Sequence, residues 1–328
     1  MGNCACDVGA GQLDPSAPLS FFFLELTPEC NNSCLGCGNV FARDRSRPPL
    51  SASEWARVID RIAPLKPRLR LTGGEPTLHP EFEKILRHVQ STGLPYTVFS
   101  NARWHNPEQT LDMLTGATGL EGVLVSLHGA RAESHEAFTN SPGSFEETTA
   151  NIRRATRAGL NVVTSSVIMR QNFDEIARIV ALSEELGAHH TVFSRYIGPP
   201  MASIEPDEQQ LITAVRSVED VSDGNGRAQF GSPVPRCFTS NHSNGCMAGF
   251  VHATIDPWGC LRPCPHVPIT AGNVLEEDFN CIWHAQAMET WRSRLLAQCD
   301  GCASVSVCRS ACLAQAYWRE TPRDPLLS

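Results

Sequence analysis

The chain lacks the features that mark several classes of protein. Of its 328 residues, 27 are Lys or Arg and 35 are Asp or Glu, so the formal net charge is −8. A general nucleic-acid-binding protein usually carries a basic surface, and this charge argues against one. No stretch approaches the roughly 18 apolar residues of a membrane-spanning helix, and no signal-peptide core precedes the first predicted strand. We therefore expect a cytoplasmic protein that binds neither nucleic acid nor membrane.

Cysteine is absent from one long part of the chain and crowded elsewhere. The chain has 14 cysteines, and none lies between 40 and 236. Two stand near the start of the sequence, Cys4 and Cys6, three lie in 30–37, and nine lie in 237–312. In a reducing compartment such clusters indicate metal sites or catalysis rather than disulfides. Two cysteine-bearing regions therefore flank a cysteine-free body.

The body alternates between predicted strands and helices. Runs rich in β-branched and aromatic residues predict six strands, at Phe21–Leu26, Arg68–Thr72, Tyr96–Ser100, Gly122–Leu127, Asn161–Ile168 and His190–Tyr196. Helical periodicity lies between them, with a capping box at Ser51 and Glu54 and a cap at Asp174. Alternation of this kind predicts a parallel sheet covered by helices. Six units are fewer than the eight of a closed barrel, so we expect an α/β fold with a partial (β/α)6 TIM-type barrel.

Three cysteines follow the first predicted strand with the spacing Cys30-x3-Cys34-x2-Cys37. Three thiolates hold three irons of a four-iron cluster, whereas four cysteines are the usual set. The fourth iron is then open to a small molecule. This arrangement favours a catalytic iron–sulfur cluster over a structural one.

Small and polar residues follow three other predicted strands, at the end where ligands gather in such folds. The second strand runs into Gly73-Gly74-Glu75-Pro76, where paired glycines permit a close backbone approach and the carboxylate suits an ammonium group. Asn101 and Ser126 stand at the ends of the third and fourth strands. Taken alone, the glycine segment is better explained as a plain strand-end turn.

Together, the cysteine motif and the Gly73–Pro76 segment resemble the radical S-adenosylmethionine (SAM) superfamily over roughly 21–200. The resemblance implies a [4Fe–4S] cluster on Cys30, Cys34 and Cys37, with SAM bound to the open iron. It also implies that Gly73–Pro76 contacts the methionine amino group of SAM, and that Asn101 and Ser126 meet its ribose or carboxylate.

One residue departs from the pattern of that superfamily. An aromatic residue usually precedes the third cysteine and lies beside the adenine of SAM, whereas this chain has Gly36 there. The adenine is then expected to pack on Phe41 or on the backbone near Val167.

The C-terminal cysteines resemble the signature of a SPASM extension, which binds auxiliary iron–sulfur clusters. The matching segments are Cys246-x12-Gly259-x4-Cys264 and Cys299-x2-Cys302-x5-Cys308-x3-Cys312. Paired Cys-x2-Cys elements also suit tetrahedral zinc, which remains the alternative. We expect an N-terminal segment at 1–19, the barrel at 20–200, a linker at 201–235 and a SPASM-like domain at 236–328.

The resemblance also implies which cysteines hold which auxiliary cluster. One cluster takes Cys237, Cys246, Cys264 and Cys312, and the second takes Cys299, Cys302 and Cys308. The family's fourth ligand of the second cluster lies downstream of Cys312, where this sequence has no cysteine. The candidates for that position are Cys260, Cys281, Cys4, Cys6 and Asp324. Otherwise one iron is open, and Cys260 and Cys281 are ordinary buried thiols.

The activity implied by the resemblance is that of a radical SAM oxidoreductase or maturase. An electron from a flavodoxin or ferredoxin-type reductant cleaves SAM to a 5′-deoxyadenosyl radical, which abstracts hydrogen from a substrate C–H bond. Members with a SPASM extension commonly modify peptides, and others act on tetrapyrroles or small molecules. About 20 residues precede the first strand, too few for a leader-binding domain, so a peptide would need either a separate leader-recognition protein or leader-free binding.

We expect peptide modification by crosslinking or oxidation, with a small-molecule or tetrapyrrole substrate as the alternative. A hypothesis of another class is a non-catalytic scaffold or redox sensor, in which the cysteines hold zinc or iron–sulfur groups for structure. That hypothesis predicts neither SAM binding nor formation of 5′-deoxyadenosine.

Overall fold

The computed structural model describes residues 19–328 except 43, 45, 223–225, 240–244, 295, 310, 320–323, 325 and 327–328. Cys4 and Cys6, two candidate ligands, lie outside the described residues. No helix in the part of the chain that the structure describes is long and apolar enough to cross a membrane.

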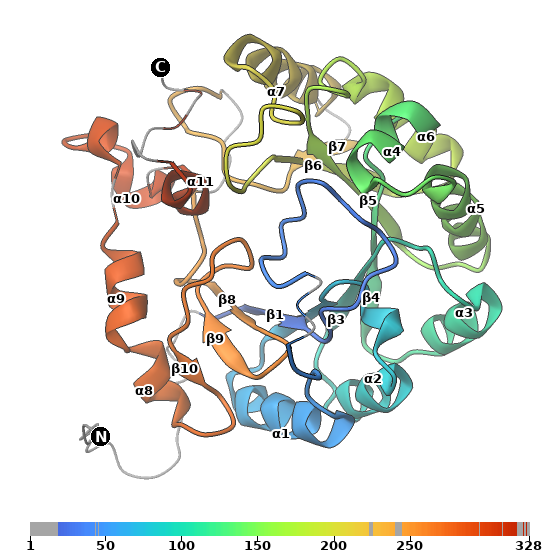
Figure 1. The fold of residues 1–328 in the computed structure, drawn as a ribbon, viewed down its shortest axis with the longest axis vertical. Helices are drawn as coiled ribbons and strands as arrows, with labels where there is room; N and C mark the ends of the chain where they lie inside the picture. The colour runs from blue at the N-terminus through green and yellow to red at the C-terminus, as the bar shows by residue number, and fades with distance from the viewer. Residues whose placement is uncertain are drawn as a thin grey trace.

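Ten strands form one curved sheet in the order β10-β9-β8-β1-β2-β3-β4-β5-β6-β7, with helices around its outside (Figure 1). The strands from β1 to β7 pair in parallel, each with the next. Their bounds are β1 Phe21–Glu25, β2 Arg68–Thr72, β3 Tyr96–Ser100, β4 Leu120–Ser126, β5 Val162–Ile168, β6 His190–Arg195 and β7 Ala228–Phe230. The partial (β/α)6 barrel is confirmed, and the six predicted strands agree with β1 to β6 to within two residues at each end.

Seven longer helices lie in the barrel part of the chain. They are α1 Ala52–Ile62, α2 Phe82–Ser91, α3 Pro107–Thr115, α4 Ala132–Thr139, α5 Ser144–Arg157, α6 Ile176–Glu185 and α7 Glu208–Ser222. The capping box that begins α1 is confirmed, because the Ser51 side chain accepts from the Glu54 amide and Glu54 accepts from the Ser51 amide. The predicted cap of α6 at Asp174 is wrong, since Glu175 is the N-cap residue.

Strand residues alternate between an outer, helix-covered face and the barrel interior. On β1 and β2, Phe22, Leu24 and Leu69 are fully buried in the main hydrophobic core, together with residues of α1 and α2. Their neighbours Phe21 and Phe23 face the other way and are half-buried. Period-2 alternation of this kind places polar strand-end residues inside the barrel mouth.

The segment expected as a linker, 201–235, contains regular structure. Helix α7 packs against α6, and β7 adds a parallel strand beside β6. A second hydrophobic cluster lies beneath them, built from residues such as Ile179, Phe193 and Val215. These contacts extend the barrel at its β6 edge.

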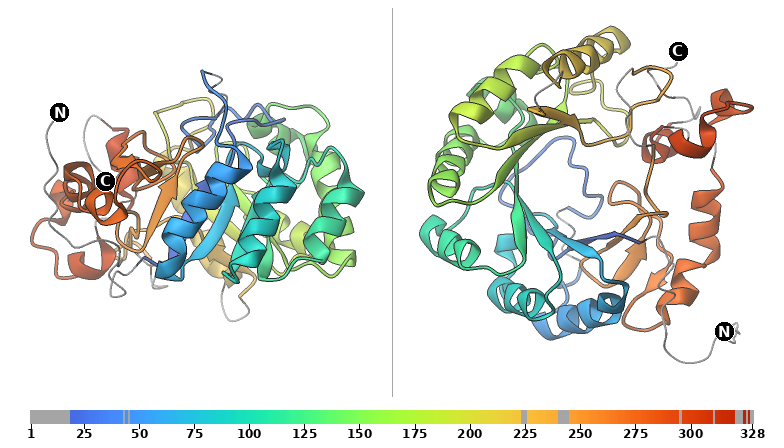
Figure 2. Two further views of the ribbon diagram at one scale, coloured as in Figure 1. Left: turned by 90° about the horizontal axis from the view of Figure 1, so that it is seen from below. Right: turned by 180° about the vertical axis from the view of Figure 1, so that it is seen from behind.

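The C-terminal part of the chain joins the same sheet at the opposite edge. Strand β8 (His252–Ile255) pairs in parallel with β1, and β9 (Cys260–Arg262) and β10 (Gly272–Asn273) follow in antiparallel. Helices α8 (Phe279–Trp283), α9 (Gln286–Arg292), α10 (Val305–Cys308) and α11 (Leu313–Tyr317) line this side of the barrel (Figure 2).

Candidate active site

The first cysteine motif lies in the loop between β1 and α1, which crosses the mouth of the barrel (Figure 1). Cys30 and Cys34 are half-buried and Cys37 is exposed. The loop is tied to the end of α4, because the Ser33 amide donates to the Thr139 carbonyl and the Leu35 amide to the Phe138 carbonyl, both at 2.9 Å. The three thiols therefore stand at the carboxyl ends of the strands on a fixed backbone.

Gly73 and Gly74 support this loop from below. The Gly74 amide donates to the Thr27 carbonyl at 2.7 Å, and the Glu75 amide donates to the Glu29 carbonyl at 2.6 Å. A Cβ on Gly74 would lie 2.6 Å from the carbonyl carbon of Glu29. Gly73 has a φ of 141°, which favours glycine. The close approach expected of the paired glycines is thus to the chain's own backbone, just before Cys30.

Glu75 is fully buried and its carboxylate is held by protein donors. It accepts from the Thr77 hydroxyl at 2.7 Å, the Ser100 hydroxyl at 2.9 Å and the Asn101 amide at 2.7 Å. Burial raises the pKa of Glu75, while these hydrogen bonds oppose the rise. The carboxylate therefore joins the ends of β2 and β3, and Pro76 begins the short 3-10 helix Pro76–Leu78 after it.

Asn101 lies directly against the first cysteine. Its Nδ2 is 3.7 Å from Cys30 Sγ and donates to Asn31 Oδ1 at 2.7 Å. The Asn32 amide also donates to Cys30 Sγ, at 3.4 Å. Burial raises the pKa of the Cys30 thiol to about 11, and the Asn32 amide lowers it. N–H groups aimed at a cysteine sulfur are typical of iron–sulfur sites, and this donor set fits a cluster. Ser126, at the end of β4, is half-buried and in register with Ser165.

The side chain missing at Gly36 is replaced from the end of β6. A Cβ on Gly36 would lie 2.6 Å from the ring of Tyr196, which is 4% exposed and packs with Ile204 and Cys34. Phe41, the expected alternative, instead packs on Trp258 at 5.1 Å and under Arg262 at 4.6 Å. An aromatic ring therefore does lie against the residue that precedes the third cysteine, and it comes from Tyr196.

Three of the C-terminal cysteines form a compact buried group. Cys246, Cys264 and Cys312 belong to one hydrophobic cluster and are 4%, 7% and 4% exposed. Burial raises the pKa of all three, that of Cys312 to about 12. Such thiols are held protonated unless a metal replaces the proton.

The other C-terminal cysteines lie nearer the surface, except Cys308, which is buried. Cys237 and Cys302 are exposed, and Cys299, Cys260 and Cys281 are half-buried. Among the described residues, no three His, Cys, Asp or Glu side chains converge closely enough to ligate one metal ion.

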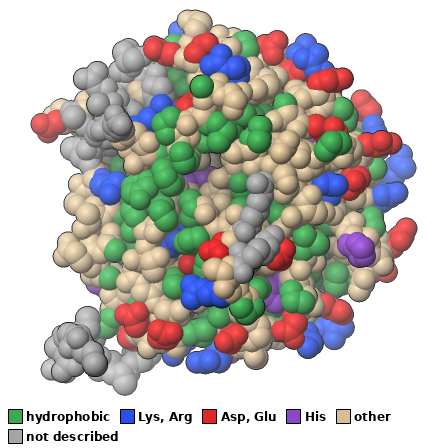
Figure 3. All heavy atoms as spheres, viewed as in Figure 1, with side chains coloured by type: hydrophobic (Ala, Val, Ile, Leu, Met, Phe, Trp, Pro, Cys, Tyr) green, Lys and Arg blue, Asp and Glu red, His purple; other side chains and the backbone are tan. Residues whose placement is uncertain are grey.

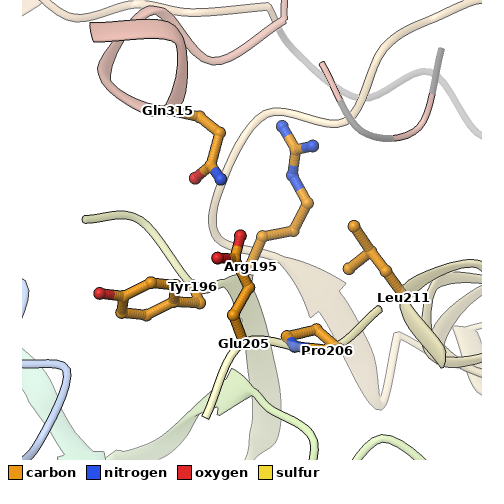
Figure 4. Close-up of a pocket in the computed structure, with 6 residues that line it drawn as sticks. All are labelled: Arg195, Tyr196, Glu205, Pro206, Leu211 and Gln315. Carbon is orange, nitrogen blue, oxygen red and sulfur yellow. The ribbon is translucent and has the colours of Figure 1, made fainter. Parts of the chain in front are cut away.

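Asp324, an expected alternative ligand, is engaged elsewhere. Its two oxygens bind the guanidinium of Arg195 at 2.8 and 3.0 Å, and both side chains are buried. Beside this pair, a cavity of about 20 Å3, room for one water molecule, lies between the end of β6 and α11. Figure 4 shows Arg195, Tyr196 and Gln315 around it. The carboxylate therefore fastens the end of the chain to the barrel.

The sequence did not indicate that Arg195, Tyr196 and the segment 27–29, which Gly73 and Gly74 contact, take part in this site. Nothing local marks these residues, because their partners lie far away along the chain.

Comparisons with known proteins agree with this geometry. The model of the radical SAM superfamily matches residues 24–183, and that of an iron–sulfur cluster-binding domain, SPASM, matches residues 246–312. The AdoMet-dependent heme synthase of Methanosarcina barkeri is 28% identical over 319 residues, which cover 89% of this chain and 90% of that protein. The PqqA peptide cyclase of Methylocella silvestris is 26% identical over 308 residues, covering 89% and 82%.

A solved structure shares the fold. Streptococcus suis SuiB bound to precursor peptide SuiA aligns with a TM-score of 0.77 at 17% sequence identity, over 94% of this chain and 75% of that one. The cofactors are accordingly SAM and [4Fe–4S] clusters. The chain belongs to the radical SAM superfamily, as a member with a C-terminal SPASM domain.

Proposed function

We propose that Cys30, Cys34 and Cys37 hold the SAM-binding cluster, and that the enzyme uses it to modify a peptide by crosslinking or oxidation. The observation that carries the catalytic assignment is the three-cysteine loop, fixed at the barrel mouth by its hydrogen bonds to Gly74 and Glu75. When bound, SAM and its cluster supply one-electron reductive cleavage and hydrogen-atom abstraction from a C–H bond. A flavodoxin or ferredoxin-type protein supplies the electron.

The chain's own residues position the reactants. The Gly73–Pro76 segment, Asn101 and Ser126 bind SAM at the ends of β2, β3 and β4. Glu75 acts by orienting this site, because its oxygens already accept hydrogen bonds from Ser100, Thr77 and the Asn101 amide. Tyr196, packed against Gly36, closes the loop on its inner side and excludes water there.

A peptide substrate is supported by the peptide cyclase relative, which resembles this chain along most of both sequences. The structural neighbour with a bound precursor peptide has the same fold. A separate protein that recognises the peptide's leader is proposed as a partner. On the face in Figure 3, hydrophobic side chains gather in the upper middle while most charged side chains lie near the rim. Among the described residues, Leu35 in the cysteine loop is the exposed large hydrophobic side chain.

A tetrapyrrole substrate is the second candidate. The observation in its favour is the similarity to a heme synthase, which extends over 90% of that protein. The amount of 5′-deoxyadenosine released above the background without substrate distinguishes a peptide substrate from a tetrapyrrole. A rise with precursor peptides supports the first proposal, and a rise with an iron porphyrin alone overturns it.

The catalytic assignment is tested with Cys34→Ala in protein purified and reconstituted without oxygen. We expect 5′-deoxyadenosine formation with dithionite and SAM to be abolished, while the iron of the C-terminal domain remains. Ser33→Ala, in the same loop, is the matched control, because only the backbone amide of Ser33 binds α4. Cleavage that survives in Cys34→Ala would remove this cysteine from the catalytic cluster.

A further inference from the structure

The two halves of the catalytic loop are supported by different parts of the chain. The first half is tied to α4 through the backbone amides of Ser33 and Leu35. The second half, residues 37–41, lies against the segment 258–267, which includes β9 and falls within the SPASM match. These two segments are more than 200 positions apart in the sequence. The SPASM domain therefore supports the half of the loop that carries Cys37.

Arg262 is the side chain that joins the parts of this contact. Its guanidinium forms an ion pair with Glu25, the last residue of β1, and both side chains are at most 1% exposed. The same guanidinium lies 4.6 Å from the centre of the Phe41 ring. Its Nη1 donates to the carbonyl oxygens of Pro265 and Val267, both at 3.1 Å. One buried side chain thus connects the end of β1, the catalytic loop and the turn after β9.

The strand register explains why Arg262 points toward the catalytic loop. Through β8, Arg262 is in register with Phe23 on β1. Residues in register point to the same face of a sheet, and so do residues two positions apart on one strand. Arg262 therefore shares the inner face with Phe23 and Glu25. Because Glu25 is in register with Thr72, the ion pair lies at the strand ends from which the cysteine loop and the Gly73–Pro76 segment both leave.

Two further ring contacts fix the backbone after Cys37. The Phe41 ring packs edge-on against Trp258, with the ring centres 5.1 Å apart. A Cβ on Gly38 would lie 2.4 Å from Cε1 of His266, so the imidazole occupies the space beside this glycine. A displacement of the SPASM segment would therefore be passed directly to the backbone that follows Cys37.

We propose that Arg262 is a positioning residue for the binding of SAM, which acts from the SPASM domain by fixing the second half of the catalytic loop through Glu25 and Phe41. The proposal rests on the proposed function, in which Cys37 is a ligand of the SAM-binding cluster. The place of the open iron is set by the three sulfurs that hold the cluster. A loop whose second half is loosened should therefore bind SAM less tightly, although Arg262 acts only through other residues.

The test measures the dissociation constant of SAM in the full chain, purified and reconstituted without oxygen. The signal is the change that SAM causes in the electron paramagnetic resonance (EPR) spectrum of the reduced protein. Glu25→Gln/Arg262→Gln replaces the ion pair by neutral side chains, so that no buried charge is left unpaired. Phe41→Leu removes only the ring and keeps the ion pair, so it gives a second reading if the double variant does not fold.

We expect both variants to raise the dissociation constant of SAM by about tenfold, because a buried contact between a guanidinium and a ring is lost in each. The KM for SAM should rise by the same factor while kcat at saturating SAM is little changed, as for a loss of binding alone. The iron content should stay at that of the unsubstituted protein. An unchanged dissociation constant in both variants would overturn the proposal.

Two substitutions control for a general loss of stability. Phe250→Leu removes another ring that lies beside a guanidinium, that of Arg309, at 4.0 Å. Arg292→Gln removes a guanidinium that lies 4.1 Å from the Trp283 ring and donates to the Gly249 carbonyl at 2.7 Å. Neither contact involves the catalytic loop, so both variants should leave the dissociation constant of SAM unchanged. If they weaken SAM binding as much as Phe41→Leu does, the proposal is overturned.

Hydrogen exchange of the loop gives a reading that needs no SAM. The amides of residues 37–42 should exchange faster in Glu25→Gln/Arg262→Gln and in Phe41→Leu than in the unsubstituted protein and the two controls. Equal exchange in all five proteins would overturn the proposal. An unsubstituted protein that binds no SAM would overturn the proposed function, whereas faster exchange in the two loop variants would still support the positioning of the loop by Arg262.

Discussion

Substituting Gly74 by Ala should disrupt the catalytic loop through packing alone. The added Cβ would lie 2.6 Å from the Glu29 carbonyl carbon, well inside ordinary van der Waals contact, so segment 27–29 must move by about 1 Å. Overpacking of this kind costs about 1–3 kcal/mol. Two short hydrogen bonds, from the Gly74 amide and the Glu75 amide, are weakened as well, at about 0.5–1.5 kcal/mol each. Together these costs come to about 2–6 kcal/mol, and they fall on the loop segment that precedes Cys30.

The assay is anaerobic reconstitution followed by iron counting and 5′-deoxyadenosine formation. Gly74→Ala should lose the iron of the catalytic cluster and SAM cleavage while keeping the auxiliary iron. Gly116→Ala is the matched control, because a Cβ at Gly116 would make one ordinary contact of 3.5 Å. If Gly74→Ala kept full iron content and full cleavage, the glycine pair would not position the loop, and the packing argument would be refuted.

The remaining predictions concern stability. Asp324→Asn breaks the buried pair with Arg195 and should lower the free energy of unfolding by about 3–5 kcal/mol, whereas Glu185→Gln, in the exposed pair with Arg153, should cost less than about 1 kcal/mol. Equal effects in urea denaturation would contradict the burial argument. Burial lowers the pKa of His135 from 6.5 to about 4, so the unfolded chain binds a proton that the folded one does not, and stability is lost as pH falls below 6.5. Between pH 7 and pH 5 the free energy of unfolding should fall by about 2 kcal/mol for this reason. In His135→Gln that part of the pH dependence of the free energy of unfolding should disappear. An unchanged pH dependence would show that His135 is not held neutral in the folded protein.

The sequence predicts the barrel well because each of its strands carries its own local signal. The sequence did not predict strands β8 to β10. Strands β9 and β10 are three and two residues long, too short to show an alternation of apolar and polar residues. Asp174 stands where a cap is expected, yet Glu175 takes the position because its buried carboxylate binds the Ser134 hydroxyl at 2.6 Å and the Ala130 amide at 3.0 Å.

In the site, too, the sequence predicts what neighbouring residues form and does not predict contacts between residues that are far apart along the chain. The cysteine spacing and the glycine pair are visible in the sequence, because the residues that form each motif are neighbours. The carboxylate of Glu75 looks like a ligand group in the sequence, but Ser100 and the Asn101 amide reach it only after β2 and β3 pair. Tyr196 fills the space at Gly36 from 160 positions further along the chain, so no local pattern reports it.

The parallel pairing of β1 with β8 has a consequence for how the protein is made. Strand β1 obtains its neighbour β2 early in synthesis, but its other neighbour is His252–Ile255, more than 220 positions further along the chain. Until the ribosome has released that segment, β1 is an edge strand with unpaired backbone groups, of the kind that recruits foreign strands. Contacts so distant in sequence also form slowly. The loop that carries Cys30 therefore gains its final support only after residues 252–255 have been made, and we expect an iron–sulfur cluster to be bound there only after that point.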